Sequence, residues 1–550
     1  MEEKLWHKSY PSHVPMNFQI ENVTLGKLLS RTVKKFPDKV ALTFLGSEIS
    51  YSLLEDHINR FANALKKLGM VPGDKLAILL PNSPQQIIGF HSAWRAKGVA
   101  IPCNPLYTDS ELENILNDSG AKFLLTWDVF APRMLKLKAK TKLKIIISAH
   151  FNDYMKSPAK EEFTKNPSSY APYFKEDDYY EFFTLLQDSS AEFDGQYAPM
   201  ESMAMLPYTG GTTGVPKGVV LTHRNISASA QFGMIWFDHL DENETVLSGF
   251  PYFHVAGFCV GLNIATGKGW TNVLIARPAP AQFLELWAQY KPTIVAAVPV
   301  TFYKLLEMPE LKDFDFSSVK LFLSGATSVP VDLVDALGKI SGKTLREAGG
   351  MTETSGINNF APPIGPYKKG SCGLPAPTTE TKIMDLETGT QELPVGEIGE
   401  LVIRGPHVMK EYYNNPEETK IVLRNGWLYT GDIGKLDEDG YLYIIDRKKD
   451  VIIAGGYNIY PQDIEEVLFK YPKVQMACAI GVPDSYRGET VKVFIVPMQN
   501  AELTEEELDR YCRQHLAAYK VPKVYEFVDS LPTNAAGKVL RKELRKKSEE

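Results

Sequence analysis

The residues best suited to chemistry lie in one stretch, Tyr208–Gly218, with the sequence YTGGTTGVPKG. Its glycines let backbone N–H groups approach an anion closely, its threonines add hydroxyl donors, and its lysine adds a positive charge. The candidates are Thr209, Gly210, Gly211, Thr212, Thr213, Gly214 and Lys217. A Walker A loop is excluded because Pro216 precedes the lysine and Gly218 follows it. The stretch therefore predicts a phosphate-binding loop.

Further charged side chains stand at Gly-flanked turns. Glu353 ends the run GGMTE, where a carboxylate stands at a Gly-flanked turn. Asp432 ends the run YTGD, where a carboxylate offers hydrogen-bond acceptors at a turn. Lys538 follows the loop PTNAAG near the end of the chain. Taken alone, each of these residues is typical of a surface turn.

The elements that must position these residues alternate between strand and helix. A helix is expected from Ser52, capped by Ser52 with Glu55 and stopped at Gly69. The expected elements after it are strand 75–80, helix 85–97, strand 99–101, helix 109–118 and strand 121–126. This alternation predicts a parallel α/β fold.

The second half of the chain has a different order of predicted secondary-structure elements. Short apolar runs from Glu397 predict a small β-rich unit. Helix 461–469, strands 475–481 and 491–496, and helix 505–516 predict a compact α+β ending. We therefore expect a large N-terminal domain over residues 1–448, built of αβ subdomains plus the β-rich unit, and a small mobile α+β domain over residues 449–550.

Composition narrows the class of protein. The chain has 550 residues with a net charge of −7 and a pI of about 5.9, so it offers no global positive field for nucleic acid. The five cysteines are scattered and form no CxxC pair, which favours a reducing compartment. The N-terminus lacks a secretory pattern and no run of 18 apolar residues occurs, so we expect a cytoplasmic protein, with peripheral membrane contact and a homodimer left open.

Several motifs along the chain carry a family resemblance. Besides the glycine-rich stretch they are PYFH at 251–254, GMTE at 350–353, GEL at 399–401, YTGD at 429–432, DRKKD at 446–450, GGY at 455–457, and the run from Pro532 through Gly537-Lys538 to Arg541. In this order and spacing the chain resembles the adenylate-forming superfamily of acyl-CoA synthetases, luciferases and adenylation domains, and it is most similar to fatty-acid–CoA ligases.

The resemblance implies an AMP-forming acyl-CoA synthetase that uses ATP, Mg²⁺ and CoA. It implies that Glu353 and Thr209 bind the metal, that Asp432 accepts hydrogen bonds from the ribose hydroxyls, and that Lys538 neutralises the carboxylate and the α-phosphate as they approach. The nucleotide contacts that it implies, beyond the glycine-rich stretch, are Gly325, Ala326, Thr327, Gly349, Gly350, Met351, Thr352, Asp432, Ile444, Arg447 and Lys538. Lys449 matches the hinge between the domains, and Gly455 and Gly456 match the turn that helps to build the pantetheine channel.

The acyl substrate is assigned less directly. His254 and Phe258 match the acyl-binding wall, together with Gly325, and His254 is also a candidate catalytic residue. Both His254 and Phe258 are equally typical of core residues. The chain departs from the family at Gly349, where most relatives have an aromatic residue that stacks on adenine, and at Gly210, where many have serine. We expect a medium- or long-chain fatty acid. The alternatives are a short, hydroxylated or aromatic acid, or a non-catalytic nucleotide- or acyl-binding homologue.

Overall fold

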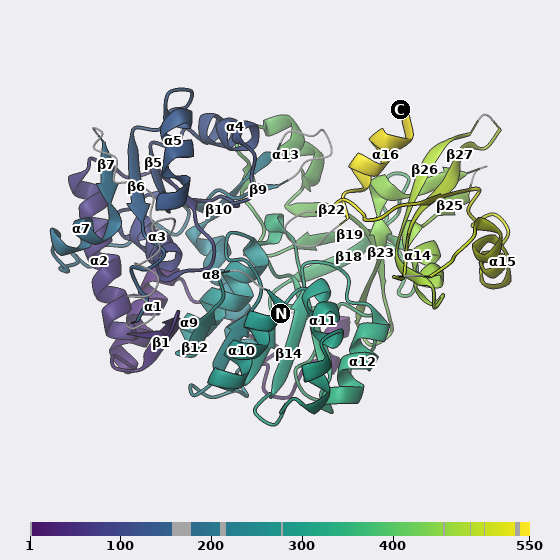
Figure 1. Ribbon diagram of the computed structural model, residues 1–550, viewed down its shortest axis with the longest axis horizontal. Helices are drawn as coiled ribbons and strands as arrows, with labels where there is room; N and C mark the ends of the chain where they lie inside the picture. The colour runs from purple at the N-terminus through teal and green to yellow at the C-terminus, as the bar shows by residue number, and fades with distance from the viewer. Residues whose placement is uncertain are drawn as a thin grey trace. The chain divides into compact units, whose positions relative to one another are not determined.

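The computed structural model describes residues 3–156, 178–209, 216–276, 279–454, 457–484, 486–499, 501–533 and 539–549. The chain divides into two compact units (Figure 1). Unit 1 comprises Met1–Glu380 and Arg404–Gly426, and unit 2 comprises Thr381–Ile403 and Trp427–Glu550. The boundary expected at residue 449 falls inside unit 2 and stays a prediction.

The first sheet of unit 1 carries the ends of several candidate site segments. Its described strands run in the order β17-β16-β15-β14-β13-β11-β12-β1-β2. The six strands from β15 to β1 are parallel, and antiparallel strands flank them at both edges. The bounds are β1 Val40–Phe44, β2 Ser47–Ser50, β11 Thr245–Ser248, β12 Thr271–Leu274, β13 Ile294–Ala296, β14 Leu321–Gly325, β15 Leu345–Gly349, β16 Asn359–Phe360 and β17 Leu374–Pro375.

The second sheet of unit 1 carries the predicted phosphate loop. Its order is β20-β10-β8-β4-β3-β5-β6-β7, and β9 pairs with β10. The bounds are β3 Lys75–Leu79, β4 Val99–Pro102, β5 Phe123–Trp127, β6 Ile145–Ala149, β7 Tyr179–Glu181, β8 Met203–Met205, β9 Tyr208–Thr209, β10 Lys217–Thr222 and β20 Glu411–Tyr412. Strands β3 to β6 are parallel, which confirms the predicted α/β alternation.

Helices cover the two sheets of unit 1. They are α1 Leu25–Lys35, α2 Tyr51–Lys67, α3 Pro84–Arg95, α4 Asp109–Ser119, α5 Ala131–Lys138, α7 Phe182–Gln187, α8 His223–Trp236, α9 Ile264–Lys268, α10 Pro280–Tyr290, α11 Pro299–Leu306, α12 Val331–Ser341 and α13 Pro416–Val422. The predicted cap of α2 was wrong. Ser50, not Ser52, accepts the Leu53 N–H at 3.1 Å, while Gly69 does end the helix with φ of +93°.

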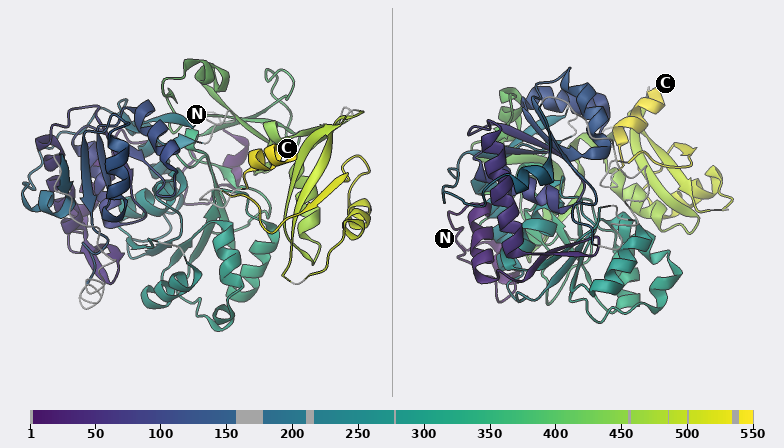
Figure 2. Two further views of the ribbon diagram at one scale, coloured as in Figure 1. Left: turned by 45° about the horizontal axis from the view of Figure 1, so that its top comes forward. Right: turned by 60° about the vertical axis from the view of Figure 1, so that its left-hand side comes forward.

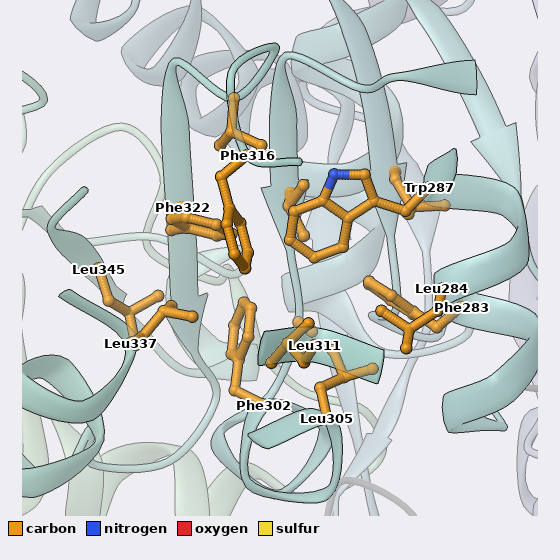
Figure 3. Close-up of a cluster of buried hydrophobic side chains, with 14 of the residues drawn as sticks. Phe283, Leu284, Trp287, Phe302, Leu305, Leu311, Phe316, Phe322, Leu337 and Leu345 are labelled. Atoms are coloured by element: carbon orange, nitrogen blue, oxygen red, sulfur yellow. The ribbon is translucent and has the colours of Figure 1, made fainter. Parts of the chain in front are cut away.

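One hydrophobic core backs the strands β13, β14 and β15. Trp287 of α10 lies 5.7 Å from Phe322 of β14 and 5.6 Å from Phe316, measured between ring centroids (Figure 3). Phe302 of α11 and Leu337 of α12 complete the cluster. These helices lie side by side in Figure 1, and the same teal helices stay together in both views of Figure 2. The packing fixes the strands whose carboxyl ends carry Gly325 and Gly349.

Unit 2 contains two smaller sheets. One is formed by β18 Glu380–Met384, β19 Gly399–Arg404, β22 Trp427–Leu436 and β23 Leu442–Arg447, which is the predicted β-rich unit. The other has the order β25-β24-β27-β26, with β28 beside β27. Its bounds are β24 Ile452–Ala454, β25 Tyr457–Ile459, β26 Val474–Asp484, β27 Gly488–Pro497 and β28 Val524–Phe527, and its helices are α14 Pro461–Phe469, α15 Glu505–His515 and α16 Arg541–Glu549. The predicted α+β ending is confirmed.

Two features concern the predictions about cysteine chemistry and membrane spans. All five cysteines lie among the described residues, are buried, and form no disulfide. No helix in the described part of the chain combines the length and the hydropathy needed to span a lipid bilayer.

Candidate functional site

The predicted phosphate loop is bracketed by a two-stranded pairing. Strand β9 ends at Thr209 and β10 begins at Lys217, and these two residues are paired across the strands. The structure therefore brings the predicted threonine and lysine together at the base of the loop. Gly210, Gly211, Thr212, Thr213 and Gly214 lie outside the described residues.

Lys217 contacts two side chains that lie about 200 residues later in the sequence. Its Nζ lies 2.5 Å from Glu418 Oε2 on α13 and 5.4 Å from the ring centroid of Tyr412 on β20. The lysine side chain is only 14% exposed. An anion that binds Lys217 would therefore meet an ammonium that already has a carboxylate partner.

Glu353 is a buried carboxylate with one defined partner. It lies in the short 3₁₀ turn Thr352–Thr354 after Met351, and the Tyr412 hydroxyl donates to its Oε1 at 2.7 Å. The carbonyl of Glu353 accepts the Met409 N–H at 2.8 Å, so backbone and side chain are both fixed. No donor among the described residues reaches Oε2. One oxygen of Glu353 is therefore left for a ligand.

The carboxyl ends of β14 and β15 meet at a small cavity. Gly325 lies opposite Ala348, and a Cβ on Gly325 would come within 2.1 Å of the Ala348 carbonyl oxygen, so only glycine fits there. The cavity has a volume of about 10 Å³, enough for one water molecule. It is lined by Phe250, His254, Val255, Ala256, Val260, Leu323, Ser324, Gly325, Ala326, Ala348, Gly350 and Gly356.

The predicted acyl wall is only partly at this cavity. His254 lines it, and its Nδ1 accepts the Ala256 N–H at 3.3 Å. Phe258 does not line it, because its ring packs in the core against Phe90 and Trp94 of α3, with centroids 5.3 and 5.9 Å away. Phe258 belongs to a π-helical segment, Gly257–Asn263, that runs directly into α9. The structure therefore brings His254, but not Phe258, beside Gly325, Ala326 and Gly350.

Gly349 ends β15, and the space beside it is filled from β16. Gly349 pairs with Asn359, and a Cβ on Gly349 would lie 2.6 Å from Asn359 Nδ2. The Asn359 amide donates to the Cys372 carbonyl and accepts from Asn358 Nδ2 at 2.9 Å. An aromatic residue at 349 would thus have to displace a buried, hydrogen-bonded amide.

A buried carboxyl, Glu347, lies two residues before Gly349 on β15. Burial raises its pKa to about 8. Its hydrogen bonds with Cys372 and with the backbone of Val329 act in the opposite direction and lower the pKa. Val329 closely follows Gly325, Ala326 and Thr327, the predicted adenine segment, in which Ala326 has a positive φ of 66°. Glu347 therefore ties this segment to the carboxyl end of β15.

Several of the predicted nucleotide contacts lie in unit 2. Asp432 on β22 pairs with Arg447 at the end of β23, and Arg447 Nε lies 2.5 Å from Asp432 Oδ1. Ile444 is half-buried on β23, opposite Gly434. Lys449 follows in a 3₁₀ turn, and burial lowers its pKa. Gly455, Gly456 and Lys538 lie outside the described residues.

Three residues of the site were missed from the sequence: Tyr412, Glu418 and Glu347. Tyr412 and Glu418 lie in the segment EYYNNPEE, which carries no spacing pattern of its own, and they reach Lys217 and Glu353 only through the pairing of β20 with β10. Glu347 shows one weak signal, an acidic residue inside an otherwise buried strand.

Family models and full-length relatives both match this chain. A family model described as AMP-binding enzyme matches residues 29–413, and one described as AMP-binding enzyme C-terminal domain matches residues 463–538. The chain is 39% identical over 547 residues to a long-chain-fatty-acid–CoA ligase of Bacillus subtilis, covering 98% of each protein. It is 32% identical over 529 residues to a feruloyl-CoA synthase of an Amycolatopsis species, covering 96% of this chain and 100% of the relative.

Solved structures agree with the sequence relatives. ATP-bound MatB from Rhodopseudomonas palustris has a TM-score of 0.85 at 28% identity, covering 96% of this chain and 99% of that one. An anthranilate CoA ligase in complex with anthranoyl-AMP has a TM-score of 0.86 at 25% identity, covering 97% and 98%. These matches confirm the resemblance drawn from the motifs. The chain belongs to the AMP-binding enzyme family, within the adenylate-forming superfamily.

Proposed function

We propose that this chain is an ATP-dependent acid–CoA ligase whose acid is a medium- or long-chain fatty acid. The observation that carries the proposal is the cavity at β14 and β15, where apolar residues such as Phe250 and Val260 meet Gly325 and Gly350. At about 10 Å³ the cavity holds no more than a water molecule, so it marks only where an apolar tail would begin beside Gly325 and Gly350, and it would have to open to admit an acyl adenylate. The printed name of the Bacillus subtilis relative, a long-chain-fatty-acid–CoA ligase, supports the choice of acid.

Magnesium would enter with ATP. Mg²⁺ is usually bound by one or two carboxylates together with substrate phosphates. Glu353 fits this donor set, because one oxygen is fixed by Tyr412 and no described residue donates to the other. Thr209 at the base of the phosphate loop could add a hydroxyl. Bound Mg²⁺ would neutralise phosphate charge as pyrophosphate leaves. In the described residues no group of three or more His, Cys, Asp or Glu forms a separate metal site.

In the first step, a carboxylate oxygen of the acid attacks the α-phosphorus of ATP and the bond to pyrophosphate breaks. Both partners are anions, and two like charges about 4 Å apart repel by about 1 kcal/mol in water and more at a lower dielectric. We assign to Lys538 the removal of this repulsion and to Asp432 and Arg447 the binding of the ribose. Lys217 and the threonines of the loop would hold the phosphates.

In the second step, the CoA thiol loses its proton to solvent and its sulfur attacks the acyl carbonyl, so that a thioester forms and AMP leaves. We propose that residues after Lys449 turn about this hinge between the steps, which would remove Lys538 and bring Gly455 and Gly456 to the pantetheine. Such gating is a common use of a hinge in enzymes.

The test uses purified protein with Mg·ATP and CoA, and saturated acids from short to long alongside hydroxy and aromatic acids. AMP, pyrophosphate and acyl-CoA are measured together. Acyl-CoA with equal AMP, highest on medium or long chains, is the expected result. Turnover with none of the acids would contradict the proposal and favour a non-catalytic binding protein.

A second candidate is a ligase for short, hydroxylated or aromatic acids. The observation that favours it is the 10 Å³ volume of the cavity, which any acid would have to enlarge but which a short acid would have to enlarge less than a long chain would. The feruloyl-CoA synthase relative is named for an aromatic acid. The same acid panel separates the two, because this candidate requires the highest kcat/KM on a short or aromatic acid.

The reaction proposed here draws on ATP and CoA, and we therefore propose a cytoplasmic location. Peripheral membrane contact and a homodimer are further hypotheses. Flotation with lipid vesicles tests the first, and sedimentation equilibrium tests the second.

A further inference from the structure

Tyr412 stands between two residues to which the proposed function gives separate tasks. Its hydroxyl donates to Glu353 Oε1 at 2.7 Å, and its ring centroid lies 5.4 Å from Lys217 Nζ. Only 8% of Tyr412 is exposed. One buried side chain therefore touches both the predicted metal-binding carboxylate and the predicted phosphate-binding cation.

The backbone of Tyr412 is fixed as firmly as its side chain. Strand β20 pairs with β10, with Tyr412 opposite Val219, two residues after Lys217. The Tyr412 N–H donates to Thr419 Oγ1 at 3.0 Å, and its carbonyl accepts the Asn415 N–H at 3.2 Å. The ring position is thus set by β10 and by α13, not by the turn that carries Glu353.

Glu418 provides a second contact to the lysine. Its carboxylate pairs with Lys217 at 2.5 Å, while the aromatic face of Tyr412 offers a second, weaker attraction for the same ammonium. Lys217 therefore contacts both a carboxylate and a ring, each of which belongs to the segment 412–418.

We infer that Tyr412 is a positioning residue for the first half-reaction, which fixes the Glu353 carboxylate and the Lys217 ammonium relative to each other. The inference rests on the proposed function. Mg²⁺ demands nearly ideal octahedral geometry, and partners that orient a metal-binding carboxylate typically change metal affinity or activity by 10–100-fold when removed. The hydroxyl of Tyr412 acts on Glu353 in this way.

The variant Tyr412→Phe removes the hydroxyl and keeps the ring. The matched control is Tyr413→Phe, because Tyr413 is the adjacent residue and its hydroxyl forms no hydrogen bond with a described residue. The Tyr413 ring centroid lies 5.3 Å from Lys75 Nζ. The first readout is Mg·ATP binding by titration calorimetry without acid. The second is the Mg²⁺ concentration that gives half-maximal ATP–pyrophosphate exchange with an acid.

For Tyr412→Phe we expect about a tenfold weaker Mg·ATP affinity and about a tenfold higher half-maximal Mg²⁺. For Tyr413→Phe we expect both values within about twofold of the unmodified protein. Wild-type Mg²⁺ dependence in Tyr412→Phe would overturn the inference. So would an equal shift in both variants, since that would mean a general effect of losing a tyrosine hydroxyl in this segment.

A third variant separates the two contacts of Tyr412. Glu418→Gln removes the carboxylate beside Lys217 and leaves the hydrogen bond to Glu353 intact. It should change the KM for ATP several-fold with an unchanged Mg²⁺ dependence, and a shift in Mg²⁺ dependence as large as that of Tyr412→Phe would contradict the assignment. Thermal unfolding of each variant shows whether it is folded. If no acid gives exchange in the unmodified protein, the proposed function fails, whereas the calorimetric comparison still tests Tyr412.

Discussion

Replacing Glu347 by glutamine should stabilise the protein, and more so as the pH rises. Burial raises the pKa of Glu347 from 4.5 to about 8, so the folded state keeps the carboxyl protonated where the unfolded chain has lost the proton. The folded pKa is the higher one. The stability that Glu347 contributes is therefore fully present below pH 4.5 and is lost as the pH rises to about 8.

The size of the effect follows from the two pKa values. Each pH unit between them costs about 1.4 kcal/mol, so protonating Glu347 on folding at pH 7 costs roughly 3 kcal/mol. Glutamine is always neutral, and its amide oxygen can accept the hydrogen bonds that Cys372 and the Val329 N–H give to the carboxyl. We expect Glu347→Gln to gain up to about 3 kcal/mol at pH 7 and nearly nothing at pH 4.5.

Urea unfolding of both proteins at pH 5, 6, 7 and 8 measures this difference. Tryptophan fluorescence reports mainly on unit 1, because six of the seven tryptophans lie there. The control is Glu244→Gln, since the Glu244 side chain is fully buried but paired with Lys320 at 2.7 Å, and its loss should destabilise the protein throughout this range. A difference between Glu347→Gln and wild type that stays constant with pH would refute the reasoning.

Other perturbations test separate parts of the structure. Gly349→Tyr should weaken ATP binding because its Cβ would lie 2.6 Å from Asn359 Nδ2, and adding Asn359→Gly should restore binding; calorimetry that finds tighter binding in the single variant would contradict this. Asp432→Ala should raise the KM for ATP about tenfold by removing a ribose acceptor and the 2.5 Å partner of Arg447, and the ratio to wild type should shrink with 2′-deoxy-ATP. Burial lowers the pKa of His407 to about 3, so the stability contributed by neutral His407 is present above pH 6.5 and is lost as the pH falls toward 3. In His407→Gln the free energy of unfolding in urea should therefore fall less steeply with decreasing pH, by about 1.4 kcal/mol per pH unit in that window. Parallel pH curves for the variant and the wild type would argue against this.

Elements whose signals are local were predicted well from the sequence. Helix α14 has the predicted bounds, Pro461–Phe469, because proline at its first turn and the apolar spacing of its core face both act within the helix. Helix α15 begins after Thr504 as predicted, and Thr504 accepts the Glu507 N–H at 3.3 Å. The cap of α2 was misplaced by two residues, because Ser50 and Ser52 both suit a cap.

The candidate site was predicted where a motif carries it and missed where a contact completes it. Thr209, Lys217, Glu353 and Asp432 could be named from short motifs. Tyr412 could not, because it is separated from Glu353 by 59 residues and meets it only once β20 has paired with β10. The filling of the Gly349 site by Asn359 depends likewise on the register of β15 with β16. Side-chain contacts between distant segments are set by tertiary packing, which no local pattern encodes.

The division of the chain between its units has a consequence for synthesis on the ribosome. Residues 404–426 belong to unit 1 but are translated after 381–403, the first segment of unit 2. At about 5–20 residues per second, the 59 residues between Glu353 and its tyrosine take roughly 3 to 12 seconds to appear. During that interval Lys217 has neither Glu418 nor the aromatic ring beside it. Lys217 and Glu353 therefore gain these partners late and together. Both gain them once residues 404–426 have been synthesised and β20 has paired with β10.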